Sequence, residues 1–159
     1  MAIEDTVAAF ALVAATSVLA FNTFILYRAT NVLAQVEKKR DRRQFLRERI
    51  SLGESITGME SNLITLYLAG VRQMNEQVAD AANSVRRLRA ILPKDGDPNL
   101  SNLVFSLDYV NMNLDNADGG AELSGVEKEV LKHVENIKSK LKLSLLPKWR
   151  AELHASYGD

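Results

Sequence analysis

The 159-residue sequence contains no cysteine, two histidines, three prolines and one tryptophan. Without cysteine the chain has no disulfide, no thiolate metal ligand and no thiol nucleophile. The histidines, His133 and His154, do not stand at metal-ligand spacings, and the sequence lacks the Glu-x-x-His pairs of di-iron helical bundles. We expect His133 to lie on a solvated helix face, and we expect no metal and no cofactor.

Motifs that mark common enzymes are also missing. There is no glycine-rich phosphate loop, no Gly-x-Ser-x-Gly and no Gly-x-Gly-x-x-Gly. The segment from Asp95 to Asn99 resembles the start of a calcium loop, but Leu100 and Ser106 stand where that loop needs glycine and glutamate. We interpret it as a turn, and we expect neither catalysis nor a small-molecule substrate.

Charge is absent from one long segment near the N-terminus. No Asp, Glu, Lys or Arg occurs among the 22 residues Thr6–Tyr27. As a helix these residues would span about 33 Å, which is enough to cross a hydrocarbon core of about 30 Å. Their lipophilic side chains favour insertion and outweigh the few polar ones, which are chiefly Asn22 and the hydroxyl residues. We predict a transmembrane helix over residues 6–27, preceded by a short segment, residues 1–5.

The two flanks of this helix differ in charge. Glu4 and Asp5 precede it, whereas residues 28–50 hold eight basic and three acidic side chains, a net charge of +5. The positive-inside tendency therefore predicts a single-pass protein with residues 1–5 exported and the remainder cytoplasmic. Two alternatives are a cleaved signal peptide, which usually has a basic start and a shorter apolar core, and an apolar core helix of a soluble oligomer.

The basic residues of the flank suggest two roles. They can lie on anionic lipid headgroups, or they can only set the topology and solvate a helix. A straight helix would carry Lys38 roughly 16 Å beyond Tyr27, so lipid contact requires a bend after Tyr27 or Arg28. Because basic residues gather here and not on a folded domain, we expect no nucleic-acid binding. The stretch comprises Lys38, Lys39, Arg40, Arg42, Arg43, Arg47 and Arg49.

Beyond residue 50 the apolar residues recur at helical spacing. Between Val71 and Leu92 they alternate three and four residues apart, as in a seam between packed helices, and similar seams follow over Leu100–Ala117 and Val126–Leu145. We predict an all-α chain with a helical bundle over residues 51–146. Its expected core is Val71, Met74, Val78, Val85, Leu88, Leu103, Leu107, Val110, Val130, Val134, Ile137 and Leu141.

Prolines mark the expected helix ends. Pro93 ends a long helix that starts near Ile56, Pro98 begins the next, and Pro147 should stop or kink the third, leaving an amphipathic tail over residues 147–159. Gly53 is a mild breaker, so we expect a continuous or kinked helix there.

Trp149 is the notable residue of the tail. It stands between Lys148 and Arg150. This pattern suits an anchor at a membrane surface or a partner, but we favour the interpretation that Trp149 closes the bundle.

The predicted long helix exceeds its two partners in length. It would cover about 55 Å, against about 30 Å and 33 Å for the two helices that fold back on it. Its first part would keep an uncovered apolar stripe, which self-association or a partner helix should cover. The stripe consists of Leu52, Ile56, Met59 and Leu63.

The expected function follows from this layout. We expect a single-pass, membrane-anchored structural, scaffolding or assembly subunit that acts through helix–helix interactions. Its partners would be the lipid bilayer and either further copies of itself or other subunits of a membrane complex. The alternatives are a signalling module that relays changes between membrane and bundle, and an accessory subunit of a larger membrane complex.

Overall fold

A computed structural model describes residues 2–71, 75–92, 98–120 and 125–158. In the described ranges the ordered elements are helices and no β-strand occurs, which confirms the all-α prediction. The chain divides into two compact units, residues 1–42 and 43–159.

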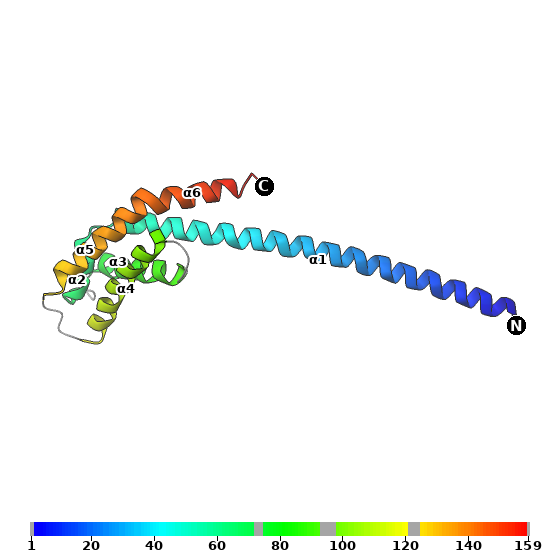
Figure 1. Cartoon of the computed structure of the whole chain (residues 1–159). Coiled ribbons are helices and arrows are strands. Elements are labelled where there is room, and N and C mark those ends of the chain that lie inside the picture. Colours follow the sequence, from blue (N-terminus) through cyan, green and yellow to red (C-terminus); the bar gives the residue numbers. More distant parts are fainter. Residues whose placement is uncertain (1, 72–74, 93–97, 121–124, 159) are drawn as a thin grey trace. The chain divides into compact units, whose positions relative to one another are not determined.

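Helix α1 (Ala2–Gly58) is the longest element and contributes residues to both units (Figure 1). It contains no proline, and it continues through Gly53 as expected. Residues 12–42, the part of the first unit whose side chains are described, are exposed throughout.

The second unit is a helical bundle. Besides the last part of α1 it holds α2 (Asn62–Leu68), α3 (Glu76–Ile91), α4 (Pro98–Asp118) and α5 (Glu127–Lys140). A π-helical turn, η2 (Leu141–Leu145), then leads into α6 (Leu146–Ala155). Helix α4 packs against α3 and α5, and the short α2 packs against α3, α4 and α5.

The expected single helix from Ile56 to Leu92 is wrong. Helix α1 ends at Gly58 and α2 ends at Leu68, before α3 begins at Glu76. Gly70 has a φ of +85°, a left-handed conformation that glycine adopts without steric cost, so the chain turns there instead of continuing the helix.

The predicted core is confirmed except at two positions. Ten of its twelve residues are buried, Val71 is half-buried and Met74 lies outside the described residues. The core also takes in side chains from α1 and from the C-terminal helix. These additions include Leu46, Leu52, Ile56, Leu146 and Trp149.

The expectation that the stripe beginning at Leu52 lacks a partner in its own chain is wrong. Leu52 and Ile56 are buried, and Met59 and Leu63 pack against the same core. The physical reason is the helix end at Gly58, which lets later helices of the same chain cover this stripe. The prediction of self-association at these residues depended on an exposed apolar stripe, and the bundle covers that stripe.

Pro147 does not stop the helical run. The chain passes from α5 through η2, and α6 starts at Leu146 with Pro147 in its first turn. Proline has no N–H and its ring crowds the carbonyl four residues earlier, so it is accepted where the hydrogen-bond pattern changes. The expected separate tail over residues 147–159 is thus helical as far as Ala155.

Helix α1 approaches the C-terminal helices most closely at Gly53. A Cβ atom on this buried residue would lie 2.9 Å from Leu146 Cδ2 and 3.6 Å from Leu141 Cδ2. At Gly58 a Cβ atom would meet nothing within 4 Å. The two glycines of one helix therefore differ in what they tolerate.

We predict that Gly53→Leu destabilises the bundle by about 1–3 kcal/mol through overpacking. Gly58→Leu, its matched control, should change the stability little. Urea unfolding of the full chain in detergent, followed by circular dichroism, measures both. Equal stabilities for the two variants would contradict the close approach at Gly53.

Leu107 provides a test of the core. It is fully buried, whereas Leu143 is 76% exposed. Leu107→Ala should cost about 2–5 kcal/mol of unfolding free energy because it removes packed side-chain atoms and leaves a cavity. Leu143→Ala should scarcely change the unfolding free energy in the same measurement. An unchanged unfolding free energy for Leu107→Ala would refute the core assignment.

Candidate membrane segment and its basic flank

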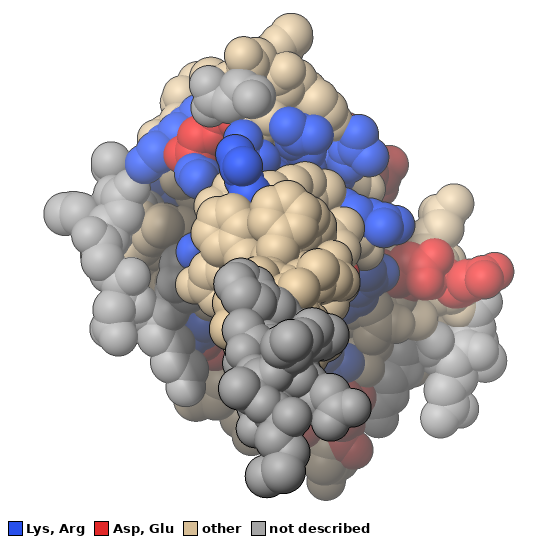
Figure 2. Space-filling view, turned by 90° about the vertical axis from the view of Figure 1, so that its right-hand side faces the viewer, with Lys and Arg blue, Asp and Glu red and all other residues tan. Residues whose placement is uncertain are grey.

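Within the first unit, residues 12–27 present an uncharged helix surface on every side. From Leu12 to Tyr27 all side chains are exposed, and the large apolar ones are between 47% and 71% exposed. The space-filling view, which looks along α1, shows a tan region at its centre with Lys and Arg in blue above and beside it (Figure 2). This helix is the one described helix long and apolar enough to cross a membrane. Length and composition therefore agree with the predicted span.

The hydroxyl groups of this segment are satisfied within the helix. Thr16 Oγ1 donates to the Leu12 carbonyl at 2.7 Å, and Ser17 Oγ donates to the Val13 carbonyl at 2.8 Å. Thr23 makes the same contact four residues back, also at 2.8 Å. A hydroxyl that is bonded to its own helix costs less to place in hydrocarbon than an unpaired one.

The basic stretch falls into two groups. Lys38, Lys39, Arg40 and Arg42 are exposed and belong to the first unit. The helix is not interrupted between Tyr27 and Lys38, which favours the solvating and topology-setting role over contact with headgroups.

Arg43, Arg47 and Arg49, unlike the first group, contact other parts of the bundle. Arg43 donates to the Ser156 carbonyl and Arg47 donates to the Tyr157 hydroxyl. The Arg43 guanidinium also lies 4.9 Å from the centre of the Tyr157 ring. These arginines attach the end of α6 to α1, and a cation beside the last carbonyls of a helix is favourable.

Arg49 lies deeper in the bundle. Its Nη2 donates to the Ile91 carbonyl at 3.1 Å, and its guanidinium carbon lies 4.2 Å from the centre of the Phe45 ring. Burial lowers the pKa of Arg49, while the Glu152 carboxylate pulls it in the opposite direction. The guanidinium stays charged at neutral pH all the same.

Trp149 closes the core and is not a surface anchor. It is only 3% exposed, and its ring centre lies 5.9 Å from the Arg49 guanidinium carbon. The sequence favours this role, although the basic neighbours of Trp149 suit a surface anchor as well.

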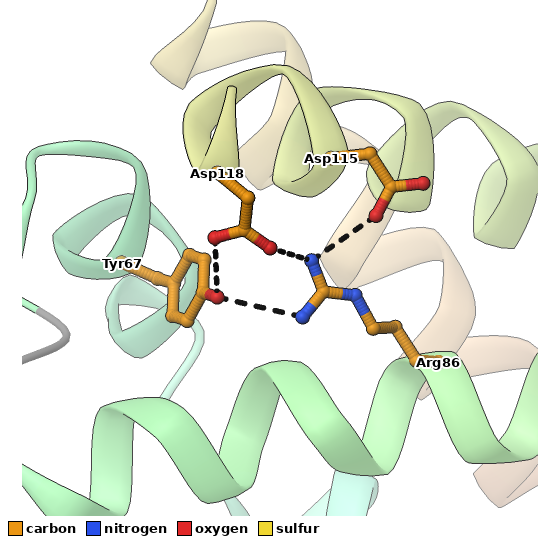
Figure 3. Close-up of polar contacts among 4 residues, drawn as sticks. All are labelled: Tyr67, Arg86, Asp115 and Asp118. Atoms are coloured by element: carbon orange, nitrogen blue, oxygen red, sulfur yellow. Dashed lines mark hydrogen bonds and ion pairs between the residues drawn. The ribbon is translucent and has the colours of Figure 1, made fainter. Parts of the chain in front are cut away.

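A polar cluster joins three helices of the bundle (Figure 3). The hydroxyl of buried Tyr67 on α2 donates to Asp118 at 2.8 Å. Arg86 on α3 donates to Asp118 at 2.6 Å and to Asp115 at 3.1 Å, both on α4. Burial alone would lower the pKa of Arg86, but hydrogen bonds with Tyr67 and Asp118 outweigh it and raise the pKa. The contacts pair residues 19 to 51 positions apart, and no local motif predicts them.

His133 is half-buried, so its expected position on a solvated face is wrong. Its ring nitrogen lies 3.2 Å from the hydroxyl of buried Ser106, and its ring centre lies 4.3 Å from that of Tyr109. Asn136 donates to the same hydroxyl at 2.9 Å. The packing of α4 against α5 produces these contacts. In the part of the chain that the structure describes, no three His, Asp or Glu side chains come together as metal ligands.

Comparison of the chain with protein-family models, curated proteins and solved structures finds no match. Any inference about its function therefore rests on its own residues. They combine an uncharged exposed helix segment, the exposed basic residues at 38, 39, 40 and 42, and a bundle with ion pairs between its helices.

We predict that Arg49→Gln lowers the unfolding free energy of the bundle by about 1–3 kcal/mol, because it removes a charged hydrogen bond and ring contacts. Arg42→Gln removes the same charge from an exposed position and should change stability by less than about 0.5 kcal/mol. Urea unfolding monitored by circular dichroism compares them. Equal effects would contradict the division of the basic stretch into two groups.

Proposed function

We propose that this chain is a single-pass membrane protein in which α1 tethers the bundle of residues 43–159 to a lipid bilayer, and that it serves as a structural or assembly subunit. The observation that carries the proposal is the uncharged surface of α1 between Leu12 and Tyr27, which is exposed throughout. Exposure of such a surface to water is unfavourable, whereas the hydrocarbon core of a bilayer can surround it on all sides.

The internal hydrogen bonds of the hydroxyl residues support insertion. A bilayer core offers no water, so each polar group there needs a partner within the protein. Thr16, Ser17 and Thr23 have such a partner in the preceding turn. The remaining polar side chain of the segment, Asn22, is considered below.

A structural role is supported by the use that the bundle makes of its polar residues. Arg86, Asp115, Asp118 and Tyr67 bind one another across three helices, and Arg43 and Arg47 bind the end of α6. These contacts hold helices together.

The proposed orientation places the bundle in the cytoplasm. It is supported by the two acidic residues before the span and the net charge of +5 over residues 28–50. Because the chain has no cysteine, a single engineered thiol reports its side of the membrane. We expect Lys142→Cys to react with a membrane-impermeant maleimide only after cells are permeabilised, and labelling in intact cells would reverse the orientation.

Insertion itself is tested by a charge at the centre of the span. Ser17→Arg should cost about 2.5–3.5 kcal/mol against an upper limit of about 3–6 kcal/mol that favours insertion. The equilibrium constant for insertion should fall by about two orders of magnitude, which lowers the carbonate-resistant membrane fraction. Asn31→Arg, beyond the span, is the matched control and should leave the chain in the membrane. If Ser17→Arg stays in the membrane as fully as the control does, residues 12–27 do not cross the bilayer.

A further inference from the structure

A seven-residue repeat runs along α1. From Ala15 to Gln35 three heptads follow one another, and each has Thr at its second position, Val or Ile at its fourth and Leu at its fifth. Lipid contacts every face of an isolated helix alike and does not require such a repeat. The fourth and fifth positions are Val18-Leu19, Ile25-Leu26 and Val32-Leu33.

The repeat places one kind of side chain on one face. The first, fourth and fifth positions of a heptad share a face of the helix. The first and fourth positions have a mean spacing of 3.5 residues, which is typical of helices that supercoil around one another. The first positions are Ala15, Asn22 and Ala29, followed by Val36. Small residues at this position allow close approach of a second helix.

Asn22 lies on this face and distinguishes it further. The Thr side chains at the second positions bond to their own helix, but Asn22 makes no side-chain hydrogen bond to any described residue. An amide contains both a donor and an acceptor. The same residue of a second, parallel chain lies at the same depth, so the two amides satisfy each other in an environment without water.

The apolar face also extends beyond the predicted span. Val32, Leu33 and Val36 follow Arg28, and they are 54%, 62% and 56% exposed. The described side chains of residues 12–42 are exposed throughout. A second helix in the same register would cover them together with the membrane part of the face.

We propose that a second copy of this chain packs in parallel against the face of α1 formed by Ala15, Val18, Asn22, Ile25, Ala29 and Val32. The interface rests on the proposed membrane insertion, and it differs from the stripe at Leu52, which the bundle itself covers. The alternative is that lipid alone contacts this face, and the experiment must distinguish that state from the packed second copy.

Four alanines allow a matched crosslinking test in the cysteine-free chain. Ala15→Cys and Ala29→Cys lie at first positions, whereas Ala20→Cys and Ala34→Cys lie at sixth positions on the opposite side of the helix. Each pair samples one depth in the span and one beyond it. The full-length variants are placed in phosphatidylcholine vesicles and oxidised with copper phenanthroline.

We expect dimer-sized, disulfide-linked product from Ala15→Cys and Ala29→Cys at several times the yield of their controls. Two Cα atoms must come within about 7 Å for a disulfide, and sixth positions on outer faces do not. Equal yields at first and sixth positions, or no product at either, would overturn the interface. Failure of the unsubstituted chain to float with vesicles would instead refute the proposed insertion, and the interface with it.

Asn22 is tested by Asn22→Leu against Asn31→Leu, which lies at a third position off the face. Energy transfer between labelled full-length chains in vesicles measures the dimer dissociation constant. Loss of an interhelical hydrogen bond in a membrane weakens association by roughly 3-fold to 20-fold. We expect this for Asn22→Leu and no change for Asn31→Leu. An unchanged constant for Asn22→Leu would overturn the pairing of the two amides.

Discussion

A helix that is apolar around its whole circumference cannot be covered by a single neighbouring face of protein. Most helices of soluble proteins bury one stripe and expose another, and in the bundle α5 does so, with Val130, Val134 and Ile137 buried and its charged residues outside. Between Leu12 and Tyr27, α1 has no polar stripe to expose. This constraint accounts for the proposed bilayer and for the separation of the chain into two units.

The same helix changes character within its length. Past Arg42 it becomes a member of the bundle, where Leu46, Leu52 and Ile56 are buried and its arginines bind the C-terminal helix. Gly53 allows η2 and α6 to approach, and the helix end at Gly58 allows the chain to cover what would otherwise be an exposed stripe. One continuous helix thereby contains both an uncharged, exposed segment and residues of the buried core.

Much of the bundle could be predicted from the sequence because its apolar residues follow the helical period so regularly. Leu103, Leu107 and Val110, for example, are buried as their spacing predicts. The breaks at Gly58 and Gly70 could not be predicted, because glycine is only mildly unfavourable in a helix and tertiary packing decides whether the helix ends.

Contacts between distant residues were equally hidden in the sequence. Arg42 and Arg43 are neighbours, yet one is exposed and the other binds the Ser156 carbonyl, since which side of α1 meets α6 depends on the packing of the whole bundle. The cluster around Arg86 follows the same rule. By contrast, the heptads of α1 can be found in the sequence. The structure adds that Val32 and Leu33 are exposed, which makes the repeat a candidate interface.

The most direct test of the account is to measure whether lipid or water surrounds α1. Ser17→Cys and Lys142→Cys variants of the full chain, each carrying a nitroxide spin label in lipid vesicles, can be compared for their collisions with oxygen and with a water-soluble nickel chelate. We predict high oxygen and low nickel accessibility at residue 17, and the reverse at residue 142. Free access of the nickel chelate to residue 17 would contradict the account, because the uncharged surface of α1 would then face water.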